Sequence, residues 1–190
     1  MDKQTHIIKT AQKLFSQFGL KKVTTDDIAR EARISKTTLY KFYRNKEDVF
    51  QDVVELETNQ MISRITESVG AQDSVESKLK AFLNAKISSI HNLINFYRVT
   101  HDSWNEHWPY VSEIHDRFLN EEKRILLAIL TEGNRSGELA VDNVELHAHI
   151  LAISLKSVEF PWAVPDESVS ISTIVNLIID AFLNGVRKRV

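Results

Sequence analysis

Apolar residues recur every three or four positions along most of this chain, which is the spacing of amphipathic helices. A first helix is predicted from about Gln4 to Phe18, followed by Gly19 in the position that often ends a helix. Its apolar stripe consists of Ile7, Ile8, Ala11, Leu14, Phe15 and Phe18. Only five Gly and three Pro occur in 190 residues, and so few helix breakers favour helices over strands and turns. The predicted fold class is therefore all-α.

Two short helices separated by a tight turn are predicted next. Thr24 suits the N-cap of a helix that starts near Thr25, and acidic residues in its first turn favour the positive end of the helix dipole. Ser35 suits the N-cap of a helix over residues 36–43, in which Leu39, Phe42 and Tyr43 are the candidate inward anchors. The other face carries Lys, Thr and Tyr side chains, which can hydrogen-bond to bases and phosphates.

A fourth, long helix is predicted from about Asn45 to Val69. Its first N–H groups, together with Lys46, form a candidate phosphate site. Charge supports contact with a polyanion at this end of the chain, because residues 1–50 carry a net +5 whereas residues 51–190 carry −7. The two short helices and their flanks therefore indicate a helix-turn-helix DNA-binding region.

Residues 24–50, TTDDIAREARISKTTLYKFYRNKEDVF, resemble the N-terminal signature of TetR-family transcriptional regulators. The family pattern is T-x-x-x-I-A-x-x-A-G-V-S-x-x-x-L-Y-x-Y-F-x-x-K-E-x-L, and the resemblance covers roughly the first fifty residues. It implies base-edge positions for Lys36, Thr37, Thr38, Lys41 and Phe42. It implies phosphate positions for Thr25, Tyr40 and Lys46.

Two positions depart from the family pattern. Arg33 replaces the turn glycine, so a residue with a Cβ must adopt the left-handed conformation, at a cost on the order of 1–2 kcal/mol. Phe42 and Tyr43 invert the usual Tyr-Phe order, which leaves open which ring packs inward and which faces DNA. Tyr43 is therefore also a DNA-binding candidate.

The sequence suggests a DNA-binding domain over residues 1–50 and a helical effector-binding and dimerisation domain over residues 51–190. A helix-turn-helix usually addresses two half-sites as a dimer. The last two predicted helices, about Val144–Val158 and Val169–Arg189, supply a candidate interface, because the second has apolar residues on two sides. The candidate dimer residues are Ile174, Ile178, Ala181, Phe182 and Gly185. The alternative is a C-terminal helix buried wholly within one chain.

Aromatic and histidine residues gather in the middle of the chain, where the resemblance implies an effector site. Apolar walls with a few polar groups are typical of ligand pockets. The candidate ligand residues are Phe96, His101, Trp104, Trp108, His115 and Trp162. The alternative is that these side chains form ordinary core.

Several classes of chemistry are not expected. Cysteine is absent, which excludes disulfides, zinc fingers and a thiol nucleophile and favours a reducing compartment such as the cytoplasm. The histidine spacings do not match paired metal ligands, no phosphate loop or nucleophile motif occurs, and no apolar segment is long enough to span a membrane. We therefore expect no metal, no cofactor and no enzyme activity.

The function that these features predict is a homodimeric, ligand-responsive transcriptional regulator. We expect a repressor that leaves a palindromic DNA operator when a small molecule binds. A helical protein-interaction adaptor without sequence-specific DNA binding is the alternative, and a small helical enzyme is a third hypothesis. The operator, the effector, the regulated genes and the sign of regulation do not follow from the sequence.

Overall fold

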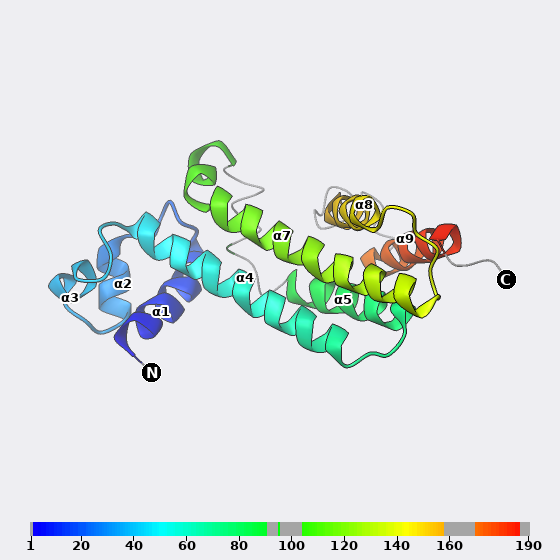
Figure 1. The fold of residues 1–190 in the computed structure, drawn as a ribbon. Helices are drawn as coiled ribbons and strands as arrows, with labels where there is room; N and C mark the ends of the chain where they lie inside the picture. Colours follow the sequence, from blue (N-terminus) through cyan, green and yellow to red (C-terminus); the bar gives the residue numbers. More distant parts are fainter. Residues whose placement is uncertain (1, 91–94, 96–103, 158–169, 187–190) are drawn as a thin grey trace. The chain divides into compact units, whose positions relative to one another are not determined.

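A computed structural model of the chain describes residues 2–90, 95, 104–157 and 170–186. The regular elements of these residues are α-helices, which confirms the predicted fold class (Figure 1). The helices are α1 (Lys3–Phe18), α2 (Thr25–Glu31), α3 (Lys36–Tyr40), α4 (Lys46–Gly70), α5 (Val75–Ile90), α7 (Trp104–Ser136), α8 (Val144–Ser157) and α9 (Ile171–Val186). None of the described helices is both long and apolar enough to cross a membrane.

The chain divides into two compact units. Unit 1 comprises residues 1–60 and 91–116, and unit 2 comprises residues 61–90 and 117–190, so α4 and α7 each contribute to both. This grouping differs from the boundary suggested at residue 50. In unit 1 the buried Glu57 of α4 accepts hydrogen bonds from Gln12 Nε2 at 3.0 Å and from Asn95 Nδ2 at 2.8 Å. These bonds join α1, α4 and residue 95, which are far apart in the sequence. A single boundary at one position of the chain cannot describe a unit that is made of two separate segments.

The core of unit 1 holds the first three helices against the start of α4. Helix α1 packs on α2, and α2 packs on α3. The rings of Phe15 and Phe50 meet edge to face, with centroids 5.2 Å apart. Leu39 anchors the short α3 with no exposed surface. In contrast, Phe18 is 56% exposed, so its predicted place on the inner stripe of α1 was wrong. The reason is that Phe18 lies in the last turn of α1, at a groove between α1 and α2.

Unit 2 is built on the end of α4, on α5, on α7 from residue 117 onward, and on α8 and α9, and α5 packs against α9. The end of α7 is tied to the following segment by Asn134, whose side chain exchanges two hydrogen bonds with the backbone of Val141. The backbone N–H of Ala140 then donates to the carbonyl of Val186 at 2.8 Å, which fixes the end of α9. These bonds satisfy backbone groups that helix ends leave without partners.

An ion pair is buried between α5 and α7 in unit 2. Lys86 Nζ lies 2.7 Å from Glu122 Oε1, and the two side chains are only 3% and 2% exposed. The same ammonium lies 5.9 Å from the centroid of the Phe82 ring. Removing one partner of such a pair is expected to be far more costly than replacing both, because the remaining charge stays buried.

We predict that Lys86→Met lowers the free energy of unfolding by about 3–5 kcal/mol, because Glu122 then keeps a buried charge without this ammonium. The double variant Lys86→Met/Glu122→Leu should recover most of that loss. Equilibrium denaturation of both variants measures the difference. A double variant as unstable as the single one would show that the ion pair itself supports the fold, and that the remaining buried carboxylate of Glu122 does not cause the loss.

Candidate nucleic-acid interface

Side chains at the ends of α2 and α3 set the two helices by local hydrogen bonds. Thr24 and Asp27 form a capping box, in which each side chain accepts from the other residue's backbone N–H. The Oγ of Ser35 accepts from Thr38 N at 3.1 Å and caps α3. The pKa of Asp27 is lowered, first by its hydrogen bond from the Thr24 hydroxyl, so the carboxylate stays charged in this role. Both predicted N-caps are confirmed.

The turn between α2 and α3 contains a residue with a left-handed backbone. Arg33 has a φ of 54°, as its replacement of glycine predicts. This conformation lets the N–H of Ile34 donate to the Ala29 carbonyl at 3.0 Å, while Arg33 N donates to the Arg30 carbonyl at 3.1 Å. The turn therefore closes the end of α2 with the same type of bonds that a glycine would permit.

Helix α3 ends at Tyr40, earlier than the predicted range of residues 36–43. Its inward anchor is Leu39, and the remaining candidates for DNA contact lie on its outer side or just beyond its end. Lys36, Thr37, Tyr40, Lys41 and Phe42 are exposed and Thr38 is partly exposed. These six therefore remain candidates for contact with DNA.

Two polar contacts connect the outer surfaces of α2 and α3. The hydroxyl groups of Thr25 and Tyr40 lie 3.2 Å apart, which brings two predicted phosphate contacts to one place. The ammonium of Lys36 lies 2.5 Å from Oδ2 of Asp26, and this hydrogen bond raises the pKa of Lys36. The sequence interpretation did not include Asp26, because its partner lies ten residues away across the turn.

Tyr43 is not part of the exposed surface. The side chain is 5% exposed, and its hydroxyl donates to Asp52 Oδ2 at 2.7 Å. Burial raises the pKa of the phenol, and the bond to Asp52 raises it further. Phe42 is 42% exposed. In the inverted Phe42–Tyr43 pair, Tyr43 therefore packs inward and Phe42 points outward. The assignment of Tyr43 to DNA binding was wrong.

Lys46 also has a different role from the predicted one. Its Nζ donates to the carbonyls of Leu20 at 2.8 Å, Val23 at 3.1 Å and Lys21 at 3.3 Å. An ammonium has three N–H donors, and these carbonyls use all of them. Lys46 therefore ties the start of α4 to the segment between α1 and α2, and the structure does not support it as a phosphate contact.

The N-terminus of α4 is closed by side chains as well. Asp48 N donates to Asn45 Oδ1 at 2.7 Å, and Asp48 Oδ2 accepts from Arg44 N at 3.1 Å. The Arg44 guanidinium also contacts Asp48 and lowers the pKa of that carboxyl. These bonds connect the start of α4 to residues 44 and 45, which follow the helix-turn-helix.

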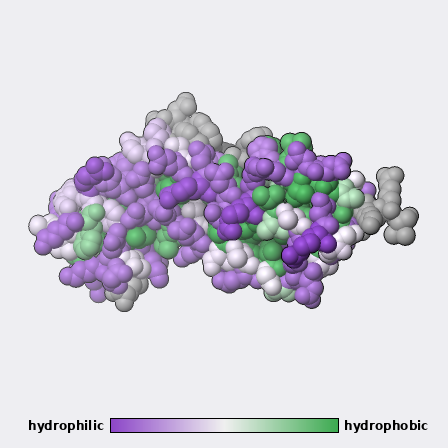
Figure 2. Space-filling model, viewed as in Figure 1, coloured by the Kyte–Doolittle hydropathy of each residue, from purple (hydrophilic) through white to green (hydrophobic). Residues whose placement is uncertain are grey.

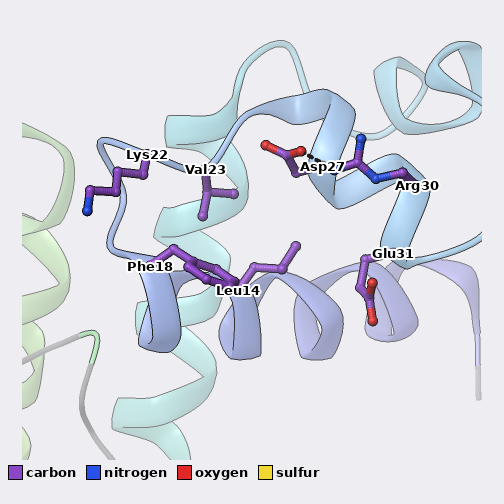
Figure 3. Close-up of a pocket in the computed structure, with 7 residues that line it drawn as sticks. All are labelled: Leu14, Phe18, Lys22, Val23, Asp27, Arg30 and Glu31. Atoms are coloured by element: carbon purple, nitrogen blue, oxygen red, sulfur yellow. Dashed lines mark hydrogen bonds and ion pairs between the residues drawn. The ribbon is translucent and has the colours of Figure 1, made fainter.

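A groove of about 300 Å³ lies between α1 and α2 (Figure 3). Its apolar lining comes from Leu14, Phe18 and Val23, and its rim carries charges of both signs. Helix α2 lines it with Asp27, Arg30 and Glu31, whereas Thr25 and Asp26 of the same helix contact α3. Helix α2 thus has one side on the groove and another toward α3, and its DNA-binding candidate Thr25 is on the side of α3.

The proposed effector residues are mostly outside the described part of the chain. Phe96, His101 and Trp162 lie there, and the side chains of Trp104 and Trp108 in α7 are not described. His115 is described and is 5% exposed, with its Nδ1 3.9 Å from Asp116 Oδ1. The described residues include no group of three or more potential metal ligands.

The proposed dimer residues lie mainly on one side of α9. Ala181 and Gly185 are exposed, and Ile174, Ile178 and Phe182 are partly exposed, whereas the opposite side buries Ile179 and Leu183. Sequence analysis missed Leu177, which is 63% exposed on the same side. On α8, Leu146, Ile150 and Ile153 are each at least half exposed at helical spacing. Figure 2 shows apolar surface in the region of α8 and α9.

Comparisons with known proteins agree with this geometry. The family model described as bacterial regulatory proteins, tetR family, matches residues 7–53. The fatty acid metabolism regulator protein of Bacillus subtilis (strain 168) is 24% identical, over 98% of this chain and 97% of that protein. The HTH-type transcriptional repressor KstR2 of Rhodococcus jostii (strain RHA1) is 25% identical, over 96% of this chain and 90% of that protein.

A solved structure shares the fold over nearly the whole chain. The transcriptional regulator FadR from Bacillus subtilis, in complex with stearoyl-CoA, superimposes with a TM-score of 0.71 and 23% identity, over 96% of this chain and 99% of that one. The similarity therefore extends beyond the DNA-binding segment into unit 2.

We predict that Lys46→Met lowers the free energy of unfolding by about 2 kcal/mol, because carbonyls of Leu20, Lys21 and Val23 lose a charged donor. The salt dependence of binding to a random-sequence DNA duplex should keep its slope. Lys41→Met is the matched control, since an exposed lysine that contacts phosphate should reduce the slope by about one without loss of stability. If Lys46→Met instead keeps its stability and reduces the slope, the phosphate assignment is restored.

Proposed function

We propose that this chain, whose residues 7–53 match the family model of bacterial regulatory proteins, tetR family, is a homodimeric repressor of that family and that a long-chain fatty-acyl thioester triggers its release from DNA. The observation that carries the DNA-binding part is the exposed polar side of α3, held by capped helix ends and joined to α2 through Thr25 and Tyr40. Short hydroxyl and cationic side chains in this position suit the major groove and the adjacent phosphates.

The proposed effector class rests on relatives. One relative is named as a regulator of fatty acid metabolism, and one solved structure with the same fold contains stearoyl-CoA. Both similarities cover at least 96% of this chain, so they include the residues of unit 2. The described helices of unit 2 bury many apolar side chains, and apolar walls are typical of sites that bind an acyl chain.

The proposed coupling runs through α4. Residues 46–60 of this helix belong to unit 1 and residues 61–70 to unit 2. Lys46 fixes its first turn to the segment that precedes α2. An effector that binds one conformation of unit 2 more tightly can thereby shift the population of DNA-binding conformations, provided that its affinities for the two states differ.

The proposed dimer interface is the apolar side shared by α8 and α9. Leu146, Ile150, Ile153 and Leu177 expose large apolar side chains on unit 2, and such patches mark interaction sites in soluble proteins. A second copy presenting the same two helices would cover the patch by two-fold symmetry. Two copies are also what a palindromic operator with half-sites about 34–36 Å apart requires.

We expect selection from a random DNA pool at near-physiological salt to enrich one palindrome, bound at least ~10³-fold more tightly than scrambled DNA. Low micromolar stearoyl-CoA should release it, whereas coenzyme A alone and butyryl-CoA should not, because they lack a long acyl chain. A binding titration with each compound measures this.

The outcomes separate the parts of the proposal. If the protein binds a palindrome but stearoyl-CoA does not release it, the proposed effector class is overturned and the proposed role as a DNA-binding regulator stands. No enrichment with or without the acyl-CoA would favour the protein-interaction adaptor.

We predict that Leu177→Arg weakens the dimer by on the order of 100-fold or more, since a charge would be buried at the interface without a partner. The fold of one chain should persist, because Leu177 is 63% exposed. Sedimentation velocity measures the oligomeric state, with the exposed Asn120→Arg of α7 as control. A Leu177→Arg variant that remains dimeric would place the interface elsewhere.

A further inference from the structure

A carboxylate lies on the surface that faces DNA, where a polyanion would be expected to disfavour it. Asp26 Oδ2 is 2.5 Å from Lys36 Nζ, and the two side chains are 50% and 61% exposed. Asp26 is not part of the capping box, which uses Thr24 and Asp27. Its favourable interaction with the dipole of α2 is small for an exposed group. Capping therefore does not account for its position beside Lys36.

The ion pair places a donor group and an acceptor group side by side between α2 and α3. In the major groove a G·C pair presents two adjacent acceptors, guanine N7 and O6, followed by the cytosine N4 donor. An A·T pair instead places its donor between two acceptors and adds a methyl group. A lysine that donates to guanine next to an aspartate that accepts from cytosine matches the G·C order.

We propose that the Asp26–Lys36 pair reads one G·C base pair in each half-site, which makes Asp26 a specificity-determining residue. The inference rests on the proposed DNA-binding function and extends it to a residue of α2. Lys36 alone would be attracted to any phosphate. Paired with Asp26, it contributes little net charge, so the pair lowers affinity for DNA in general and favours the sequence that satisfies both groups.

Other groups on the same surface can bind phosphates while the Asp26–Lys36 pair contacts a base. Lys41 is exposed beyond the end of α3, and Thr25 and Tyr40 supply neutral hydroxyl groups. These groups can hold phosphates without opening the Asp26–Lys36 pair. Direct readout of a base would use the pair as it stands in the free protein.

The test compares base preferences of the full chain and of Asp26→Asn by selection from the same random DNA pool. We expect the variant to lose its preference for G·C at one position per half-site by about tenfold. Its affinity for random-sequence DNA should rise, with a steeper salt slope by about one per chain, because Lys36 becomes free to contact phosphate. Glu31→Gln is the matched control: it removes the same charge from α2 on the side that lines the groove, and its base preference should not change.

Lys36→Met is a second variant, expected to lose preference at the same position as Asp26→Asn. The inference is overturned if Asp26→Asn keeps the full set of base preferences, or if it weakens binding to all sequences equally, as a purely structural role would. A wild-type chain that enriches no palindrome overturns the proposed function, and this inference with it. Denaturation of each variant confirms that it is folded.

Discussion

A five-residue helix has no stability of its own in water, and the candidate DNA-binding surface is built on such a helix, α3. Everything that this surface can do depends on groups outside α3 that hold it in place. Leu39 is fully buried, Tyr43 follows it into the core and bonds to Asp52, and Ser35 closes the start of the helix. With these anchors fixed, the remaining side chains of α3 are free to point outward.

Lys46 has a structural role because the short helices α2 and α3 need groups outside them to hold them in place. The segment between α1 and α2 positions the start of α2, and its carbonyls need donors where they are partly buried. Lys46 supplies three N–H groups to carbonyls of this segment from the first residue of α4. Lys46 thereby connects the start of the long helix to the segment that precedes α2, in addition to the apolar contact of Phe15 with Phe50.

Unit 2 contains a buried ion pair between two helices and a helix with one buried and one exposed apolar side. The buried Lys86–Glu122 pair fixes how α5 meets α7, because sliding one helix would separate buried charges. Helix α9 buries Ile179 and Leu183 on one side and exposes Leu177 on the other. One helix can therefore contribute to the core of its own chain and still present an apolar surface to a second chain.

The sequence by itself determined where α2 and α3 begin, the N-caps of these two helices and the left-handed turn between them. These features are local: a cap such as Thr24 or Ser35 bonds within three residues, and Arg33 replaces glycine at a fixed point of the turn. The fold class followed from helical spacing for the same reason. The exposure of Lys36, Thr37 and Tyr40 on α3 also follows from helical spacing around the buried Leu39.

Only the tertiary structure decided the contacts between distant residues. The order Phe42–Tyr43 allows either ring to face inward, and the choice depends on Asp52 lying within reach of Tyr43. Lys46 bonds to carbonyls more than twenty residues away, and Lys86 pairs with Glu122 across thirty-six residues. Such pairings depend on how helices pack, and a pattern of three or four residues along the chain carries no information about which distant group a charged side chain will meet.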